Sequence, residues 1–275
     1  MVIYELLNEL EKAIQNSDNP HFEAELIIMS ALKIDRAKYL ISKNDTVSDD
    51  TINQAMKMAK RRQLGEPLGY ILGNAEFMGM EFLLNSDILI PRPDTECLVE
   101  FVINRIGDKK LSVLDIGTGS GCIGISIAKF CKNTDVTVLD ISKNALDTAM
   151  ENAKNNGVRI DCICADILNS DIGKKFDVIV SNPPYIKTDV IKTLQTEVKD
   201  FEPMRALDGG RDGLIFYRRI CDILPQILNN GGMVAFEIGY DERCAVEELL
   251  KQTGMFKNIG SQKDLAGNDR VVYGM

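Results

Sequence analysis

Asn182, Pro183, Pro184 and Tyr185 form the stretch of this 275-residue chain with the most specific chemistry. They follow residues 176–180, mostly apolar β-formers that predict a buried strand. Because proline fixes φ and lacks an N–H donor, neither strand nor helix can continue through the two prolines. The Asn182 side chain offers an acceptor and two donors, and Tyr185 offers a flat apolar face beside it. These residues are therefore candidates for holding a planar amide or amino group with its nitrogen aimed at an electrophile.

Two prolines after a strand predict, by themselves, no more than a stiff turn. The complete stretch Asn-Pro-Pro-Tyr directly after an apolar strand is much more specific. It is similar to the motif that holds the substrate nitrogen in methyltransferases that use S-adenosylmethionine to methylate an exocyclic or amide nitrogen. In open α/β sheets, ligands bind at the carboxyl ends of the strands, which is where this stretch is expected to lie.

A glycine-rich loop, Gly117-Thr118-Gly119-Ser120-Gly121, lies between an apolar strand predicted at residues 111–116 and an apolar helix. Glycines let the backbone turn tightly and approach a ligand closely. One interpretation is dinucleotide binding, because the last two loop glycines and Gly124 match that fingerprint and Asp140 follows at a suitable distance for a ribose hydroxyl. The other interpretation places the amino-acid portion of S-adenosylmethionine over the loop.

Acidic residues that close three successive predicted strands favour the second interpretation. Asp115 precedes the glycine loop, Asp140 can bind both ribose hydroxyls, and Asp166 with Ile167 can frame the adenine. By itself, Asp166 is explained almost equally well as a turn or helix cap. The Asn-Pro-Pro-Tyr stretch decides between the interpretations. A hydride-transfer enzyme needs no amide-binding turn beside its nicotinamide, whereas a methyl donor needs its acceptor nitrogen held in line.

The rest of the chain predicts two domains. Apolar residues at helical spacing predict a helical bundle over residues 1–68, and glycines between short apolar stretches predict a β-hairpin linker over residues 69–93. Over residues 94–275 strands and helices alternate, which predicts a doubly wound α/β sheet. The bundle carries no candidate chemistry, and a solvated cap or a partner-docking module explains it equally well.

Single residues are expected to cap or separate these elements. Asp94 and Ser142 are candidate N-caps of helices, and Asn229–Gly232 is expected to separate a helix from a strand at residues 233–238. Arg92 could contact a ligand carboxylate, but a structural salt bridge is the simpler expectation.

Composition argues against several classes of function. The 32 Lys and Arg residues against 41 Asp and Glu residues give a net charge of −9, which argues against a nucleic-acid-binding surface over the whole protein. One histidine, His21, and a single closely spaced pair, Cys162-x-Cys164, without a second pair leave no expected metal site. Seven cysteines, several in apolar patterns, indicate reduced core residues and a cytoplasmic location. Neither a signal peptide nor a membrane-spanning segment is expected.

Taken together, these motifs resemble the HemK/PrmC family, the N5-glutamine methyltransferases of class I peptide chain release factors. The resemblance covers essentially the whole chain and is carried by EPLGYILGNAEFMGMEF, LIPRPDTECLVE, LDIGTGSGCIGISIA, SNPPYI, FEPMRALDGGRDGLIFYRRI and DLAGNDRVV. The combination of IPRPDTE, DIGTGSG and NPPYI in this order is highly specific, whereas any one of them alone is not. The N-terminal bundle matches only in character.

The resemblance implies a seven-stranded class I (Rossmann-like) methyltransferase domain whose last strand is reversed. It implies S-adenosylmethionine over Gly117–Gly121 and against Asn182, with ribose on Asp140 and adenine near Asp166 and Ile167. The four residues of the Asn-Pro-Pro-Tyr stretch would hold the glutamine of the release factor's Gly-Gly-Gln motif, and S-adenosylhomocysteine would be the product. The helical domain and hairpin are expected to contribute to release factor binding. We expect a monomer that contacts neither nucleic acid nor membrane.

Catalysis is expected to depend mainly on positioning. An amide nitrogen is a poor nucleophile because its lone pair is delocalised, whereas a sulfonium methyl group is already activated. We therefore expect the Asn182 oxygen and the Pro183 carbonyl to accept the two N–H bonds of the substrate amide, with Tyr185 packed against the amide plane. The sequence shows no evident general base.

Two other functions fit parts of the sequence. An N6-adenine or related nucleic-acid methyltransferase could use Asn-Pro-Pro-Tyr to hold the exocyclic amine of a flipped base. The acidic charge and the lack of an extended basic insert argue against it. A non-catalytic ribosome- or factor-binding protein could retain a nucleotide-binding sheet, but the intact glycine loop, Asp140 and Asn182 argue otherwise.

Overall fold

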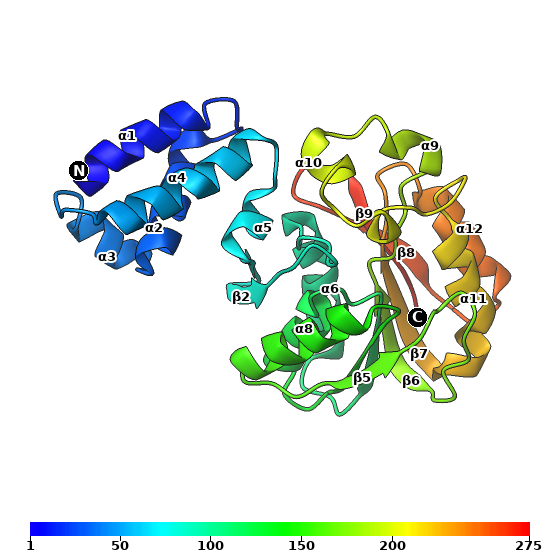
Figure 1. The fold of residues 1–275 in the computed structure, drawn as a ribbon. Helices are drawn as coiled ribbons and strands as arrows, with labels where there is room; N and C mark the ends of the chain where they lie inside the picture. Colours follow the sequence, from blue (N-terminus) through cyan, green and yellow to red (C-terminus); the bar gives the residue numbers. More distant parts are fainter. The chain divides into compact units, whose positions relative to one another are not determined.

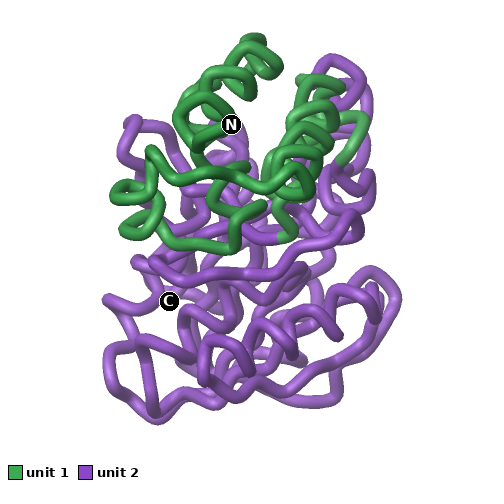
Figure 2. The backbone as a smooth tube through the Cα atoms, turned by 60° about the vertical axis from the view of Figure 1, so that its left-hand side comes forward, with its two compact units in different colours: residues 1–73, 195–201 green, residues 74–194, 202–275 purple.

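The chain forms two compact units in a computed structural model that describes residues 1–275. The first unit comprises Met1–Gly73 and Gln195–Phe201, and the second comprises Asn74–Leu194 and Glu202–Met275 (Figure 2). The segment 195–201 begins ten residues after Tyr185. The chain therefore passes from the larger unit into the helical unit and back again soon after the Asn-Pro-Pro-Tyr stretch.

The first unit is helical, as predicted. Its helices are α1 (Ile3–Ala13), α2 (Pro20–Leu32), α3 (Arg36–Ile41), α4 (Asp49–Gln63), α5 (Leu68–Leu72) and, from the returning segment, α10 (Thr196–Lys199). Asn19, Asp35 and Ser48 cap α2, α3 and α4 by accepting backbone N–H groups, each cap contributing about 1 kcal/mol. The apolar faces of α1, α2 and α4 share one buried core. None of the protein's helices has the length and apolar character needed to cross a membrane.

A buried ion-pair cluster ties the returning segment to this bundle. Arg62 of α4 lies 2.6 Å from Glu23 of α2 and 2.6 Å from Glu197 of α10. Its side chain is 5% exposed, so its buried charge needs an ionic partner, and Glu23 and Glu197 both provide one.

The second unit is built on a seven-stranded sheet with the order β5-β4-β3-β6-β7-β9-β8. The strands are β3 (Ser112–Ile116), β4 (Asp135–Asp140), β5 (Asp161–Cys164), β6 (Phe176–Ser181), β7 (Leu228–Glu237), β8 (Ile259–Lys263) and β9 (Asp269–Gly274). β9 runs antiparallel to β7 and β8, and the remaining neighbours pair in parallel. This confirms the predicted doubly wound sheet with a reversed last strand, and its strand order switches direction between β3 and β6.

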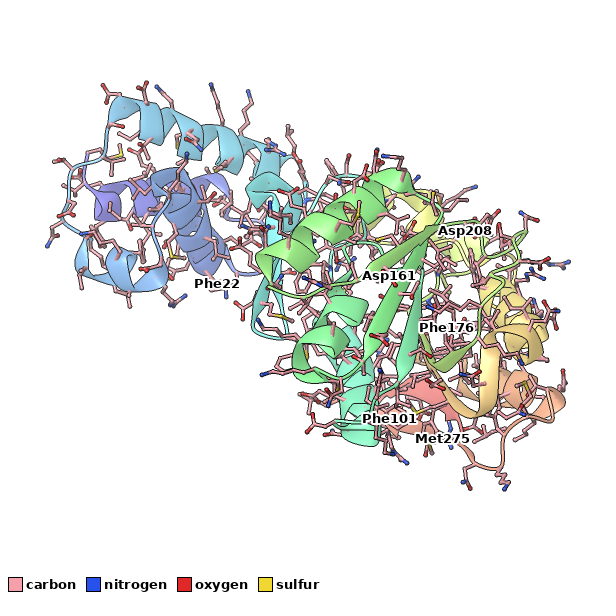
Figure 3. The ribbon with its side chains drawn as sticks, turned by 90° about the horizontal axis from the view of Figure 1, so that it is seen from below. Phe22, Phe101, Asp161, Phe176, Asp208 and Met275 are labelled. Carbon is pink, nitrogen blue, oxygen red and sulfur yellow. The ribbon has the colours of Figure 1, made fainter.

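Helices cover both faces of this sheet (Figure 1). α6 (Glu96–Ile106), α7 (Cys122–Phe130) and α8 (Lys143–Asn155) share one apolar core with the sheet, and α11 (Ile215–Ile227) and α12 (Arg243–Gln252) share the other. Phe101 of α6 belongs to the first core and Phe176 of β6 to the second (Figure 3). Parallel strands buried on both faces are near-continuously apolar, which explains their Val- and Ile-rich sequences. The two cores fix the positions of the strand ends.

The β-hairpin predicted between the two domains is formed by β1 (Asn74–Phe77) and β2 (Met80–Leu83) and belongs to the second unit. The Asn152 side chain on α8 accepts from the Leu83 N–H at 2.7 Å and donates to the Leu83 carbonyl at 3.1 Å. Glu96 on α6 accepts the Met78 N–H at 2.6 Å. The hairpin is thus fixed to helices of the second unit.

Two local expectations were wrong and one is confirmed. Pro93–Thr95 forms a 3-10 turn, η1, ahead of α6, so Asp94 is no helix cap and instead pairs with Arg270 at 3.0 Å. Asn229–Gly232 does not separate α11 from a later strand, because β7 begins at Leu228 and the Asn229 side chain donates to Asp177 of β6 at 2.7 Å. Ser142 caps α8 through the Ala145 N–H, as expected.

Candidate active site

A pocket of about 230 Å³ opens at the carboxyl edge of the sheet, at the switch point between β3 and β6. The ends of β3, β4 and β6 and the turn after β5 supply much of its wall. Residues 87–89, Arg205, Ala206 and Phe216 of α11 complete it. Eight of the predicted site residues line this pocket: Gly117, Gly119, Asp140, Asp166, Ile167, Asn182, Pro183 and Pro184.

The loop between β3 and α7 requires glycine at three positions. Gly117, Gly119 and Gly121 have φ values of 74°, 54° and 83°, in the left-handed region that other residues rarely adopt. A Cβ on Gly121 would lie 2.7 Å from Cδ1 of Ile125 and 3.0 Å from Cβ of Ala149. The third glycine therefore also allows close packing between the loop and helices α7 and α8.

Asp115 supports the loop from within the protein and does not line the pocket. Its Oδ2 atom accepts from the Thr118 hydroxyl at 2.6 Å and from the Gly124 N–H at 3.0 Å. Complete burial raises the pKa of Asp115 to about 6, although these two hydrogen bonds act in the opposite direction. Its Oδ1 atom is buried without a partner, so this side of the loop offers a favourable environment for a ligand cation.

Asp140 ends β4 with both carboxylate oxygens oriented by the backbone. Oδ2 accepts the Gly119 N–H at 3.0 Å, and Oδ1 accepts the Ser142 N–H at 2.8 Å. Each oxygen retains acceptor capacity, and the residue lines the pocket. Asp140 can therefore accept hydrogen bonds from two adjacent hydroxyl groups, as a ribose would present them.

Asp166 is both a turn cap and part of the pocket wall. Its Oδ1 accepts the Leu168 N–H at 2.9 Å, and its Oδ2 accepts from the Asn169 side chain at 2.6 Å. Arg219 of α11 donates to the carbonyls of Ile167 and Ser170, both at 3.0 Å, and so holds this turn. The buried Ile167 side chain supplies apolar surface for a flat ring.

Asn182 follows β6 directly and has a fixed neighbour. The hydroxyl of the preceding residue, Ser181, donates to the Ile116 carbonyl at 2.7 Å and joins the ends of β6 and β3. The Asn182 Nδ2 atom donates to Oγ1 of Thr95 at 3.1 Å. Because the amide nitrogen is bound on this side, Oδ1 is the Asn182 atom left to accept a hydrogen bond from a ligand.

Tyr185 is anchored from the other side of the turn and does not line the pocket. Its ring packs against the second core, and its hydroxyl donates to Oε1 of Glu237 at 3.3 Å. Burial raises the pKa of Glu237 to about 7, while hydrogen bonding by Thr95 and Tyr185 and the charge of Arg270 act to lower it. Glu237 ends β7, next to the strand that carries Asn182.

Residues 207–213 brace the Asn-Pro-Pro-Tyr turn through direct backbone contact. The Ile186 N–H donates to the Leu207 carbonyl at 2.9 Å, and the Gly209 N–H donates to the Ile186 carbonyl at 2.8 Å. A Cβ on Gly209 would lie 2.7 Å from Cα of Tyr185 and 2.8 Å from the Pro184 carbonyl oxygen. Only glycine lets the backbone at residue 209 come this close to the turn, which explains the first glycine of the sequence Asp208-Gly209-Gly210.

Polar contacts join the chain segments that complete the pocket wall. Arg205 donates to the Asp87 carbonyl and to the Ser142 hydroxyl, both at 3.2 Å, and its guanidinium lies 3.4 Å from the Asp87 carboxylate. Asn144 donates to the same carboxylate at 2.9 Å. Arg92 lies outside the wall and pairs with the buried Glu202 at 2.5 Å, which is the structural salt bridge expected for it.

Two family models and many curated proteins match this chain. The methyltransferase small domain matches residues 93–199, and the PrmC N-terminal domain matches residues 5–73. A release factor glutamine methyltransferase from Clostridium botulinum is 40% identical over 281 residues, covering 99% of this chain and 98% of that protein. One from Bacillus cereus is 37% identical over 279 residues, covering 99% of both proteins. The chain belongs to the family of release factor glutamine methyltransferases.

The fold agrees with this family. The crystal structure of a methyltransferase from Pyrococcus furiosus matches with a TM-score of 0.54 at 20% identity, covering 72% of this chain and 88% of that chain. At that identity the likeness shows the fold alone. The family assignment does not favour the nucleic-acid methyltransferase alternative.

The cofactor of this glutamine methyltransferase is S-adenosylmethionine, and the pocket fits it. The orphaned oxygen of Asp115 lies beside the loop expected to hold the amino-acid portion, and Asp140 offers two acceptors for the ribose. Ile167 and Leu139 line the pocket with apolar surface of the kind that an adenine ring requires. These features match the three chemically distinct parts of the cofactor.

The structure brings most, but not all, of the predicted residues to the pocket. Thr118, Ser120 and Gly121 are not among the lining residues and shape the loop from within. Sequence reasoning gave no role to Thr95, Gly209, Arg205 or Glu237. The glutamate could have been found by the same signal as Asp140, an acidic residue that ends a predicted strand. The other three acquire their roles only through contacts distant in sequence.

Proposed function

We propose that this enzyme transfers a methyl group from S-adenosylmethionine to the side-chain amide nitrogen, N5, of the glutamine in the Gly-Gly-Gln motif of class I release factors, and thereby modulates translation termination. The observation that carries the proposal is the fixed Asn182 amide. Its nitrogen is bound to Thr95, which leaves its oxygen available as an acceptor where the pocket wall is formed by Pro183 and Pro184. This is the group that an amide substrate requires.

The bound cofactor supplies an electrophilic methyl group, and S-adenosylhomocysteine remains after its transfer. The protein's part is to orient the acceptor. We propose that Asn182 Oδ1 and the Pro183 carbonyl accept the two substrate N–H bonds, which directs the nitrogen and favours localisation of its lone pair. The Tyr185 hydroxyl is held by Glu237, so only the ring of Tyr185 can pack against the amide.

The partner we propose is a class I release factor, bound by a monomeric enzyme in the cytoplasm without direct nucleic-acid contact. The relatives' names support the release factor. The net charge of −9 supports the absence of a nucleic-acid surface. Sedimentation of the purified enzyme alone and with release factor measures the proposed stoichiometry.

The deciding experiment is methyl transfer from labelled S-adenosylmethionine to a purified release factor, beside a release factor whose Gly-Gly-Gln glutamine is replaced. Label is expected on the first and not on the second. The Asn182→Ala enzyme should lose turnover far more than cofactor affinity. Label on DNA or ribosomal RNA but not on the release factor would move the proposal to a nucleic-acid substrate, and equal losses of turnover and affinity would contradict the role of Asn182.

A further inference from the structure

The orientation of one side-chain amide decides what the acceptor subsite can bind. Turning the Asn182 amide by 180° exchanges Oδ1 and Nδ2 with almost no change of shape. In one orientation the pocket receives an acceptor for a substrate N–H. In the other it receives a donor, which would face the substrate's own N–H bonds and repel them. The protein therefore needs a device that selects one orientation.

Thr95 is the immediate partner of this amide. Its Oγ1 atom lies 3.1 Å from Asn182 Nδ2, and the residue is 2% exposed, so water does not replace this contact. Thr95 ends the turn η1, and its backbone N–H donates to the Arg92 carbonyl at 3.0 Å. A hydroxyl has one proton and can serve as donor or acceptor. Thr95 alone therefore does not decide which way the amide faces.

Glu237 resolves this ambiguity. Its side chain is 1% exposed, its Oε1 atom accepts from Tyr185, and its Oε2 atom is buried without a hydrogen-bond partner. A buried carboxylate oxygen needs a donor, and the Thr95 hydroxyl, whose hydrogen bonding lowers the pKa of Glu237, is the neighbouring group that can supply it. An ionised carboxylate can only accept. Once Thr95 donates to Glu237, its oxygen can only accept from Asn182, and the Asn182 nitrogen must face Thr95.

We infer that Thr95 and Glu237 are positioning residues that hold the Asn182 amide with its oxygen toward the acceptor subsite. This inference rests on the proposed function, because it assigns the two residues a role in binding the substrate amide. Neither residue lines the pocket, so both act through Asn182. The arrangement explains why the IPRPDTE stretch, far from Asn182 in sequence, accompanies the Asn-Pro-Pro-Tyr turn.

The arrangement has a defined dependence on pH. A protonated Glu237 can donate to Thr95, which can then donate to the amide oxygen and release the nitrogen toward the pocket. The titratable and charged groups that face Glu237 are the Tyr185 and Tyr217 hydroxyls, the Cys122 thiol, the Arg270 guanidinium and the Asp94 carboxylate. Arg270 is itself bound to Asp94 at 3.0 Å. Because the pKa of Glu237 is about 7, turnover should fall as the pH is lowered through that value.

Thr95→Val and Thr95→Ser test the inference as a matched pair. Valine keeps the shape and removes the hydroxyl, whereas serine keeps the hydroxyl. We expect Thr95→Val to lose about 10- to 100-fold in kcat/KM for the release factor, which corresponds to leaving a buried polar partner unsatisfied. Its affinity for S-adenosylmethionine should stay within about twofold, since the cofactor contacts are untouched, and Thr95→Ser should restore most of the activity. The acid limb of the wild-type pH profile should be absent from Thr95→Val.

A measurement without substrate separates this inference from the proposed function. The NMR signal of the Asn182 side-chain NH2 group can be assigned by its loss in Asn182→Ala. Its chemical shift should change with pH near 7 in the wild-type and Thr95→Ser proteins and should not change in Thr95→Val. That pattern supports the inference even if the release factor is not the acceptor. A Thr95→Val enzyme with wild-type kcat/KM, or an NH2 signal that ignores both pH and Thr95, overturns it. Thermal melting and cofactor binding confirm that each variant is folded.

Discussion

Replacing Gly209 by alanine should damage catalysis more than cofactor binding. The new Cβ would lie 2.7 Å from the Gly213 carbonyl oxygen, 2.7 Å from Cα of Tyr185 and 2.8 Å from the Pro184 carbonyl oxygen. These are backbone atoms, so no flexible side chain can move aside. Gly209 does not have a positive φ, and the cost of the substitution is therefore steric rather than conformational.

The size of the effect follows from these distances. Ordinary contacts to a Cβ begin near 3.4 Å, so the Asn-Pro-Pro-Tyr turn must move by about 0.6 to 0.7 Å to accommodate the methyl group. Overpacking of this kind costs about 1–3 kcal/mol of stability. A displacement of about 1 Å can cost about 100-fold in rate, so this smaller shift corresponds to about a 20-fold loss of turnover.

Gly232→Ala is the matched control. Its Cβ would lie 2.8 Å from the Asp177 carbonyl oxygen, 2.8 Å from Leu228 Cδ1 and 2.9 Å from the Asn229 carbonyl oxygen, also without a positive φ. Gly232 lies in β7 before the strand's pocket end. Both variants should lose comparable stability in urea unfolding, and only Gly209→Ala should lose kcat in the methyl-transfer assay. Equal kcat losses in the two variants, or none in Gly209→Ala, would refute the reasoning.

Two further predictions concern the cofactor site and pH. Asp140→Asn should weaken S-adenosylmethionine binding about 10- to 100-fold, because a hydrogen bond to a charged group contributes about 1.5–3 kcal/mol. Calorimetry measures this affinity, and an unchanged value would contradict ribose binding at Asp140. Burial raises the pKa of Asp115 to about 6 and the pKa values of Glu237 and Glu242 to about 7. Between about pH 4 and pH 7 the folded protein therefore binds more protons than the unfolded chain. Its free energy of unfolding should fall as the pH rises through this range. Glu237→Gln should remove about 3 kcal/mol of that loss of stability. Urea unfolding of the cofactor-free protein across this pH range measures the change. A variant whose stability depends on pH as fully as the wild type would contradict the prediction.

Local sequence determined the elements and the cofactor half of the site. Apolar strands followed by glycines, aspartates or prolines predicted the strand ends, and parallel strands bring their carboxyl ends to one edge of the sheet. Gly117, Asp140, Ile167 and Asn182 therefore reach one pocket for reasons that are visible along the chain. Where local chemistry was ambiguous, as at Asp94 and Asn229–Gly232, pairing with distant residues determined the result.

Only the tertiary structure decided how the acceptor half of the site is held. Thr95 and Asn182 are 87 positions apart, and Tyr185 and Glu237 are 52 apart, so no local pattern links them. Their hydrogen bonds exist because α6, β6 and β7 pack together and exclude water. The sequence determined that an amide lies at the end of β6. The direction in which that amide faces depends on a buried network that forms only when distant segments meet, because a hydrogen bond has a direction that residue identity alone does not specify.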